Sequence, residues 1–193
     1  MSDNPIYKTL QQITGFTDSE MKMALGRFEE KKIKKKTNLL TAGKVAKEIY
    51  FIISGCMRLF YEKDGCDISA YFFTEKTFAG AYDSFVHQVK SRHSIEAIED
   101  CHLLTIDYEN LQQLYKEFPK MNELVRIVLQ ERFFDLHKLY TSLILDSPEE
   151  RYLNLTKERP DLLQRIPQHQ IASFIGVTPV SLSRIRNRIL KDR

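Results

Sequence analysis

The sequence predicts an α+β protein in which a β-rich region is followed by a helical one. Between Leu39 and Ile106, short runs of β-branched and aromatic residues recur at the roughly 8–12-residue spacing typical of sandwiches and barrels. After Ile106 the apolar residues recur at intervals of three and four, the period of a helix. Strands grouped before helices argue against alternating βαβ units.

The β-rich region is preceded by a helix start and contains five candidate strands. Thr17 and Glu20 have the spacing of a capping box, and Met21, Leu25 and Phe28 follow on one helical face. The candidate strands, separated by glycines, are residues 49–53, 57–61, 68–73, 94–98 and 102–106. Together they predict a β-roll of the jelly-roll type.

Two helices are predicted after the strands. Asp107 can cap a short helix that reaches Tyr115. From Pro119 to Leu145, apolar residues form a stripe over about seven turns. One interpretation is a core helix packed on the sheet, and the other is a helix that pairs with its copy. The stripe is longer than one small sandwich covers, which favours a dimerisation helix over residues 119–145 and therefore a homodimer.

A second domain is predicted from residue 146 to residue 193. Ser147 suits the N-cap of a new helix, with Pro148 at its first position and Glu150 at its third. Pro160 is expected to end this helix.

The C-terminal stretch predicts two short helices joined by a tight turn. Ile171 and Ile175 give the first helix an apolar face, and Gly176 suits a left-handed end. Thr178 and Pro179 then cap and begin the second helix. Ala172 is small enough to let the two helices cross closely. The inward positions of the second helix are the apolar residues Leu182, Ile185 and Ile189. This pattern predicts a DNA-binding helix-turn-helix rather than a simple helical hairpin.

The outward face of the second helix carries side chains that can read DNA. Arginine can donate to both acceptors on a guanine edge, and serine and asparagine serve bases or phosphates. Ser181, Arg184 and Arg188 share one face by their spacing, and we expect Arg184 to be the main base-reading residue. The candidate DNA-binding residues are Thr178, Pro179, Val180, Ser181, Ser183, Arg184, Asn187 and Arg188.

Basic residues are concentrated at the C-terminus, although the net charge of the chain is only +3. After Arg165 the single acidic residue is Asp192, as expected for a segment that faces phosphates. Little or no wing is expected after the second helix, so backbone contacts fall to Arg165, Lys191 and Arg193. The earlier basic run, residues 31–36, lacks interleaved aromatic residues, and we interpret it as a solvated loop or a strand edge.

With these motifs, the chain resembles the Crp/Fnr family of transcription regulators over nearly its whole length. Gly43, the Tyr50–Gly55 strand and turn, and Phe78-Ala-Gly80 resemble the family's cyclic-nucleotide-type β-roll. Residues 119–145 resemble its dimerisation helix, and residues 146–152 and 166–189 resemble its DNA-binding domain. The resemblance implies domains at 1–118, 119–145 and 146–193. It also implies a dimeric regulator of transcription without enzymatic activity, with double-stranded DNA and RNA polymerase as partners and a small ligand of open identity in the β-roll.

The resemblance weakens at the residues that hold cyclic AMP in the family. Its members carry Gly-Glu-Leu for the ribose and Arg-Ser-Ala for the phosphate, whereas this chain has Gly80-Ala81-Tyr82 and Ser91-Arg92-His93. Arg92 is displaced by one residue, and a one-residue slip on a strand sends a side chain to the opposite face. A phosphate buried without its arginine is poorly compensated. We therefore expect no tight cyclic AMP binding and no cofactor, and these six residues mark the position of a pocket for another ligand.

Composition and cysteine usage exclude several classes of protein. No stretch of apolar residues is long enough to span a membrane, and the N-terminus lacks the pattern of a secretory signal, so we expect a cytoplasmic protein. Three cysteines are too few for the usual four-thiolate iron–sulfur sensor. Cys56 and Cys101 are interpreted as core residues, and Cys66, beside Gly65, as the candidate reactive thiol.

Two other functions compete with DNA binding. A cupin-like metal enzyme needs a tight His-x-His pair, and the five histidines show no metal-ligand spacing. A signalling adaptor with a cyclic-nucleotide-type domain would use its helical tail to bind protein, and the arginines of the second helix argue against it.

Overall fold

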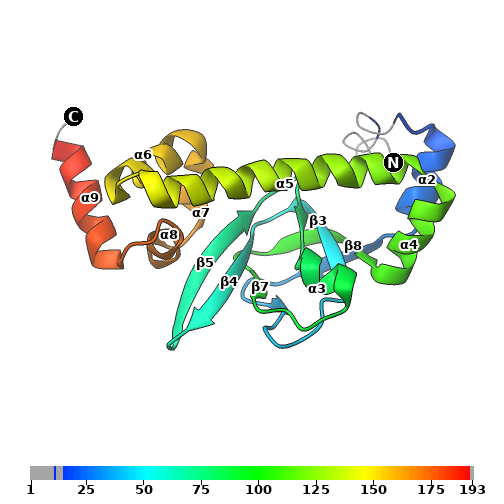
Figure 1. Ribbon diagram of the computed structural model, residues 1–193, viewed down its shortest axis with the longest axis horizontal. Helices are drawn as coiled ribbons and strands as arrows, with labels where there is room; N and C mark the ends of the chain where they lie inside the picture. Colours follow the sequence, from blue (N-terminus) through cyan, green and yellow to red (C-terminus); the bar gives the residue numbers. More distant parts are fainter. Residues whose placement is uncertain (1–10, 12–14, 192–193) are drawn as a thin grey trace. The chain divides into compact units, whose positions relative to one another are not determined.

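The computed structural model of the chain describes residue 11 and residues 15–191, which belong to two compact units (Figure 1). One unit contains the residues up to Tyr61 together with Phe72–Gln130. The other contains Glu62–Tyr71 together with the chain from Glu131 onward. Among the described helices, none combines the length and hydrophobicity that crossing a bilayer demands.

Two four-stranded sheets form the β-rich region, with strand orders β1-β8-β3-β6 and β2-β7-β4-β5. The strands are β1 (Glu29–Ile33), β2 (Asn38–Leu40), β3 (Glu48–Ser54), β4 (Met57–Lys63), β5 (Cys66–Phe73), β6 (Phe78–Ala79), β7 (Ser94–Ala97) and β8 (Cys101–Asp107). Neighbours in this order are mostly far apart in the chain, as in a roll. The prediction of an α+β fold with a β-roll is confirmed, and all five candidate strands are present.

The first two lysines of the basic run near the N-terminus, Lys31 and Lys32, lie on the edge strand β1, and the other three follow it. β1 pairs with β8 from Glu29 opposite Thr105 to Ile33 opposite Cys101, and its other side is unpaired in the sheet order. Lysines on an edge strand oppose pairing with another chain. The periodicity of apolar residues does not reveal β1, because its sequence is almost entirely polar. The strand is held in the sheet by its backbone hydrogen bonds to β8.

The core of the roll is made of buried strand residues, several of them consecutive in β3 and β8, and of one short helix. Phe51, Ile95 and Leu103 are completely buried, as is Phe85 of helix α3 (Tyr82–His87). The Phe51 and Phe78 rings meet edge to face with centroids 5.1 Å apart, a favourable arrangement for an aromatic pair. α3 was not predicted, because six residues are too few to show a helical period.

Helix caps are where the sequence predicts them. The Thr17 capping box precedes α2 (Asp18–Leu25), and Asp107 accepts from the Asn110 amide at the start of α4 (Tyr108–Glu117). α5 (Lys120–Leu145) then runs for 26 residues without a break. Its first turns are anchored in the first unit by the buried side chains of Met121 and Leu124.

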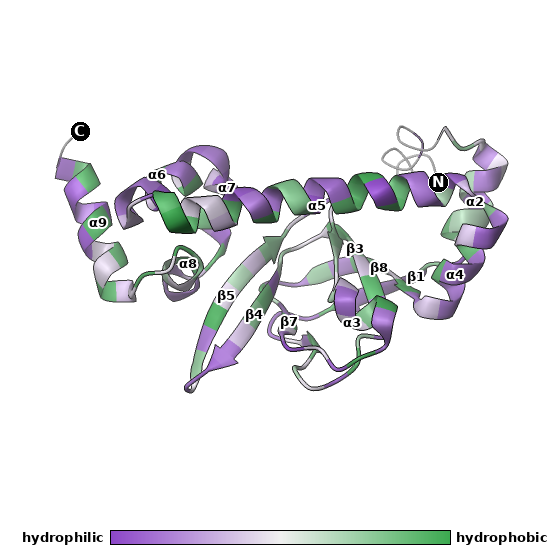
Figure 2. Cartoon of the chain, viewed as in Figure 1, coloured by the Kyte–Doolittle hydropathy of each residue, from purple (hydrophilic) through white to green (hydrophobic). Residues whose placement is uncertain are grey.

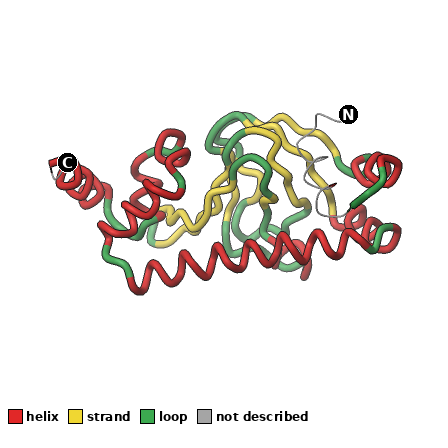
Figure 3. Tube along the Cα trace, turned by 90° about the horizontal axis from the view of Figure 1, so that it is seen from above, coloured by secondary structure: helices red, strands yellow, loops and turns green. Residues whose placement is uncertain are grey.

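The rest of the second unit is helical after α5, as Figure 3 shows in red. The helices are α6 (Pro148–Glu158), α7 (Pro160–Arg165), α8 (Gln168–Phe174) and α9 (Pro179–Lys191). The predicted Ser147 capping box forms with Glu150, with Pro148 in the first turn. Over residues 146–191 the structure contains no strand.

The β4–β5 hairpin turns at Asp64 and Gly65, which both have positive φ (53° and 73°). This is the backbone of a type I′ turn, for which Asp-Gly is a preferred pair. The Asp64-Gly65 pair could therefore predict the hairpin from the sequence, but it does not predict which residues the hairpin contacts.

We expect Gly55→Ala to destabilise the first unit severely. Gly55 has a φ of +107°, and an added Cβ would lie 2.6 Å from the Cys101 sulfur and 2.8 Å from the Asp100 carbonyl oxygen. The left-handed backbone costs about 1–2 kcal/mol and overpacking a further ~1–3 kcal/mol. Gly43→Ala is the matched control, because Gly43 also has positive φ but nothing within 4 Å. Equal losses of unfolding free energy for the two variants, measured by denaturant titration, would contradict this packing argument.

Candidate nucleic-acid interface and ligand-type site

The turn between α8 and α9 is closed by a Schellman motif. Gly176 has a φ of +72°, its amide donates to the Ser173 carbonyl at 3.1 Å, and the Val177 amide donates to the Ala172 carbonyl at 2.9 Å. These bonds satisfy carbonyl groups that the end of α8 leaves without helical partners. The left-handed residue predicted at position 176 is confirmed.

α9 starts as the sequence predicts. The Thr178 hydroxyl accepts from the Ser181 amide at 3.2 Å and lies 2.9 Å from the Ser181 hydroxyl. On the inner side, Leu182 and Ile185 are buried, and α9 packs on α8 and α6. Its opposite face is therefore fixed toward solvent.

The exposed face of α9 brings most of the candidate DNA-binding residues together. Pro179, Val180, Ser183, Arg184, Asn187 and Arg188 are exposed, as is Thr178 just before the helix. Ser181 is half-buried and is engaged by the cap. Among the described residues, none forms a hydrogen bond or ion pair with the Arg184 side chain. Arg188 differs, because its guanidinium forms an ion pair with Glu149 of α6 at 2.8 Å.

The residues expected to contact the DNA backbone differ in their exposure to solvent. Lys191 is exposed at the end of α9, whereas Arg165 is half-buried at the end of α7. Arg193 lies outside the described residues.

Arg151 of α6 joins the turn of the helix-turn-helix to the end of α5. Its Nε donates to the Ile175 carbonyl at 2.8 Å, and its Nη1 donates to the Asp146 carbonyl at 2.7 Å. One guanidinium thus satisfies backbone acceptors that follow two different helices. Sequence analysis missed this role, because the arginine is 24 residues from the turn that it holds.

The first half of β5 contacts α8 within the second unit. The Ser173 hydroxyl accepts from the Ser69 amide at 2.8 Å and donates to the Asp67 carbonyl at 3.1 Å. Nearer the base, the Tyr71 hydroxyl donates to Asp135 of α5 at 2.6 Å. Burial raises the pKa of Tyr71 to about 12, opposed by the charge of Arg132, whose guanidinium stacks 4.1 Å from the ring centroid.

The later turns of α5 expose a row of large apolar side chains. Figure 2 shows hydrophobic bands recurring along the helix. The exposed residues on one side of the helix are Leu129, Phe133, Leu136, Tyr140, Leu143 and Ile144, with Tyr140 65% exposed, while Phe134 and Leu145 are exposed on the other side. A contiguous apolar surface of this kind marks an interaction site in a soluble protein.

The six candidate ligand residues lie around α3 and the start of β7. Gly80 is packed so tightly that an added Cβ would lie within 2.4 Å of Ile49 Cδ1, while Ala81 is buried and Tyr82 is exposed. Ser91 and His93 are buried, whereas Arg92 between them is exposed. Residues 91–93 precede β7, which begins at Ser94, so they are not alternate positions of a strand; the buried side chains of this segment are Ser91 and His93.

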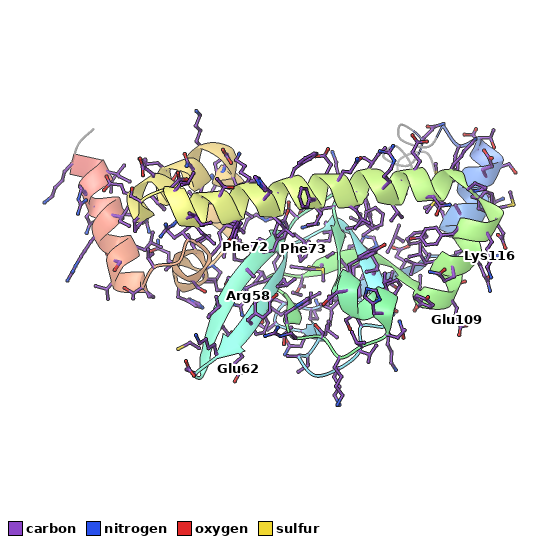
Figure 4. All side chains as sticks on the ribbon, in the orientation of Figure 1. Arg58, Glu62, Phe72, Phe73, Glu109 and Lys116 are labelled. Carbon is purple, nitrogen blue, oxygen red and sulfur yellow. The ribbon has the colours of Figure 1, made fainter. Side chains whose placement is uncertain are left out.

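Two buried polar groups nearby do not replace the missing arginine. The His93 side chain is in edge contact with Tyr61, and burial lowers the pKa of its imidazole against the opposing charge of Asp83. Arg58, labelled on β4 in Figure 4, is 2% exposed, and Glu96 balances its charge at 2.6 Å. A neutral imidazole and an internally balanced arginine provide little compensation for a phosphate.

The cysteines and histidines offer no metal centre within the described part of the chain. Cys56 and Cys101 are buried, as predicted for core residues, and Cys66 is exposed at the first position of β5.

Residues 30–118 match the sequence profile of the cyclic nucleotide-binding domain family. The chain is also 22% identical over 174 residues to the CRP-like protein Clp of Xanthomonas oryzae pv. oryzae, an alignment that covers 81% of this chain and 75% of the relative. The matched profile contains the whole region from β1 to α4, together with the six candidate ligand residues.

Solved structures share the fold of the full chain. The structure of CLP from Xanthomonas campestris, described as a c-di-GMP-responsive global regulator, aligns with a TM-score of 0.74 at 19% identity, covering 91% of this chain and 93% of that one. CooA from Carboxydothermus hydrogenoformans aligns with a TM-score of 0.72 at 19% identity, covering 94% and 84%. A putative regulator of the Crp/Fnr family from Eubacterium rectale aligns with a TM-score of 0.73 at 15% identity, covering 92% and 85%. The first half of the chain thus matches the cyclic nucleotide-binding domain family, and most of the chain shares the fold of these solved structures, one of which is described as a regulator of the Crp/Fnr family.

Proposed function

We propose that this protein is a sequence-specific, DNA-binding transcription regulator that acts as a homodimer. The observation that carries the proposal is the exposed row of Val180, Arg184 and Arg188 on a capped helix whose opposite face is buried. Such a helix can enter a major groove with its N-terminal half against base edges. The similarity to CRP-like protein Clp supports the same function.

The regulator proposed here works in the cytoplasm, with RNA polymerase as the protein whose activity it changes. The enzyme alternative finds no support in the described residues, which contain no cluster of metal ligands. The adaptor alternative has no use for an arginine-bearing helix face. A ligand-responsive roll fits the domain family, although its residues do not fit cyclic AMP.

We expect Arg184→Ala to cost about 1–3 kcal/mol of binding free energy on the preferred site and to relax the choice at one base pair. Arg184 is exposed and has no described partner to release, so the loss measures its contact with DNA. Lys191→Ala is the control. It should weaken binding to all DNA sequences alike, and it should lower the slope of the logarithm of the binding constant against the logarithm of the salt concentration by roughly one. Equal weakening of specific and random duplex by Arg184→Ala would make Arg184 a phosphate contact.

Placing aspartate at both Leu136 and Tyr140 should convert the dimer into a monomer in sedimentation. Both side chains lie on the exposed apolar row, and a carboxylate there would have to be desolvated on pairing. Lys138→Asp is the control, since Lys138 lies on the opposite side of α5 and loses only its surface pair with Glu158. A double variant that still sediments as a dimer would place the dimer interface elsewhere.

Cyclic AMP is expected to give no micromolar binding in calorimetry with millimolar nucleotide. Ala81 supplies no acid to the ribose, and the segment where the family carries its arginine buries Ser91 and leaves Arg92 exposed. Arg92→Ala serves as the diagnostic variant. Micromolar binding that this variant abolishes would mean that Arg92 reaches the phosphate and that the loop rearranges around the nucleotide.

A further inference from the structure

The two arginines on the DNA-facing side of α9 are in different electrostatic states. Arg184 has no ion pair with any described residue, whereas Arg188 Nη1 lies 2.8 Å from Glu149 Oε2. The two arginines are four residues apart and so share one helical face. The Arg188 side chain remains 64% exposed, so the pair lies at the edge of the face that meets DNA.

Glu149 is well placed to keep this contact. It lies in the first turn of α6, where the helix dipole favours a carboxylate. The capping box is completed by Glu150 and Ser147, which leaves the Glu149 carboxylate without a capping role. Replacing Glu149 therefore leaves the start of α6 intact.

The pair changes what Arg188 contributes to binding. Non-specific affinity comes mainly from phosphate neutralisation, which is insensitive to sequence. An arginine held by a carboxylate contributes less to this neutralisation than a free one. Because a like-sign approach of phosphate toward Glu149 is unfavourable, the carboxylate also repels a misplaced backbone.

We propose that Glu149 is a specificity-determining positioning residue, which restrains Arg188 and suppresses binding to random DNA. This inference rests on the proposed function and deepens it. Selectivity then has two sources on α9: a free arginine that reads bases, and a restrained arginine that does not capture phosphates indiscriminately.

The test measures affinity and salt dependence of the full chain for random duplex and for a duplex that the wild-type protein selects. We expect Glu149→Gln to tighten binding to random duplex by roughly three- to eightfold near 0.1 M salt and to steepen the salt slope by about one, the effect of one added phosphate contact. The ratio of specific to random affinity should fall. In an Arg188→Ala background the same change should have no such effect.

Glu158→Gln is the matched control, because it makes the same charge change at the other end of α6 and touches only Lys138 among described ion pairs. The inference is overturned if Glu149→Gln behaves like Glu158→Gln, or if its effect persists without Arg188. A wild-type protein with no salt-dependent binding to any duplex would overturn the proposed function itself, which separates the two failures.

Discussion

The guanidinium of Arg151 is the interaction on which the DNA-binding unit depends. It donates at once to Ile175, where α8 ends, and to Asp146, where α5 ends. Both acceptors lie at helix C-termini, where backbone carbonyls carry partial negative charge and have no helical partner. Because one rigid, planar group bridges them, the helix-turn-helix is fixed to the end of the long helix. The direction of α9, and with it the face carrying Arg184, follows from that attachment.

The region that matches the cyclic nucleotide-binding domain family differs from that family's cyclic AMP-binding members at residues that would contact a nucleotide. Gly80, next to α3, packs against the end of the Ile49 side chain. At the two positions that matter for a nucleotide, however, the chain has a methyl group at Ala81 and a hydroxyl at Ser91 that is engaged with the His93 backbone. Charge inside the roll is balanced by the protein itself through Arg58 and Glu96. A shared fold does not by itself determine the ligand, since the ligand depends on a few side chains.

Sequence analysis succeeded where structure depends on neighbouring residues. The caps at Thr17, Asp107 and Ser147 and the left-handed Gly176 each obey a rule that spans a few residues, and each is found in the structure. The helix-turn-helix could be predicted for the same reason. β1 was left undecided between loop and strand edge, because a polar strand is recognisable only by its partner β8.

Apart from the short helix α3, the features that sequence analysis missed are long-range. Ser173 contacts Ser69 of β5, 104 residues earlier in the chain, and Arg188 contacts Glu149 across 39 residues. No local pattern distinguishes Arg184 from Arg188, although the structure shows one with an ion pair and gives the other none among the described residues. Partners of this kind depend on tertiary packing, which is why the residue types at the DNA-facing surface were predictable and their electrostatic states were not.

The central claim, that the chain reads DNA as a two-fold dimer, is tested most directly by selecting bound sites from random duplex with the purified full-length protein. The account predicts enrichment of a palindrome whose half-sites are about 34–36 Å apart, one helical turn, or a multiple of that distance. Recovery of no enriched sequence, or of a single asymmetric site, would contradict it.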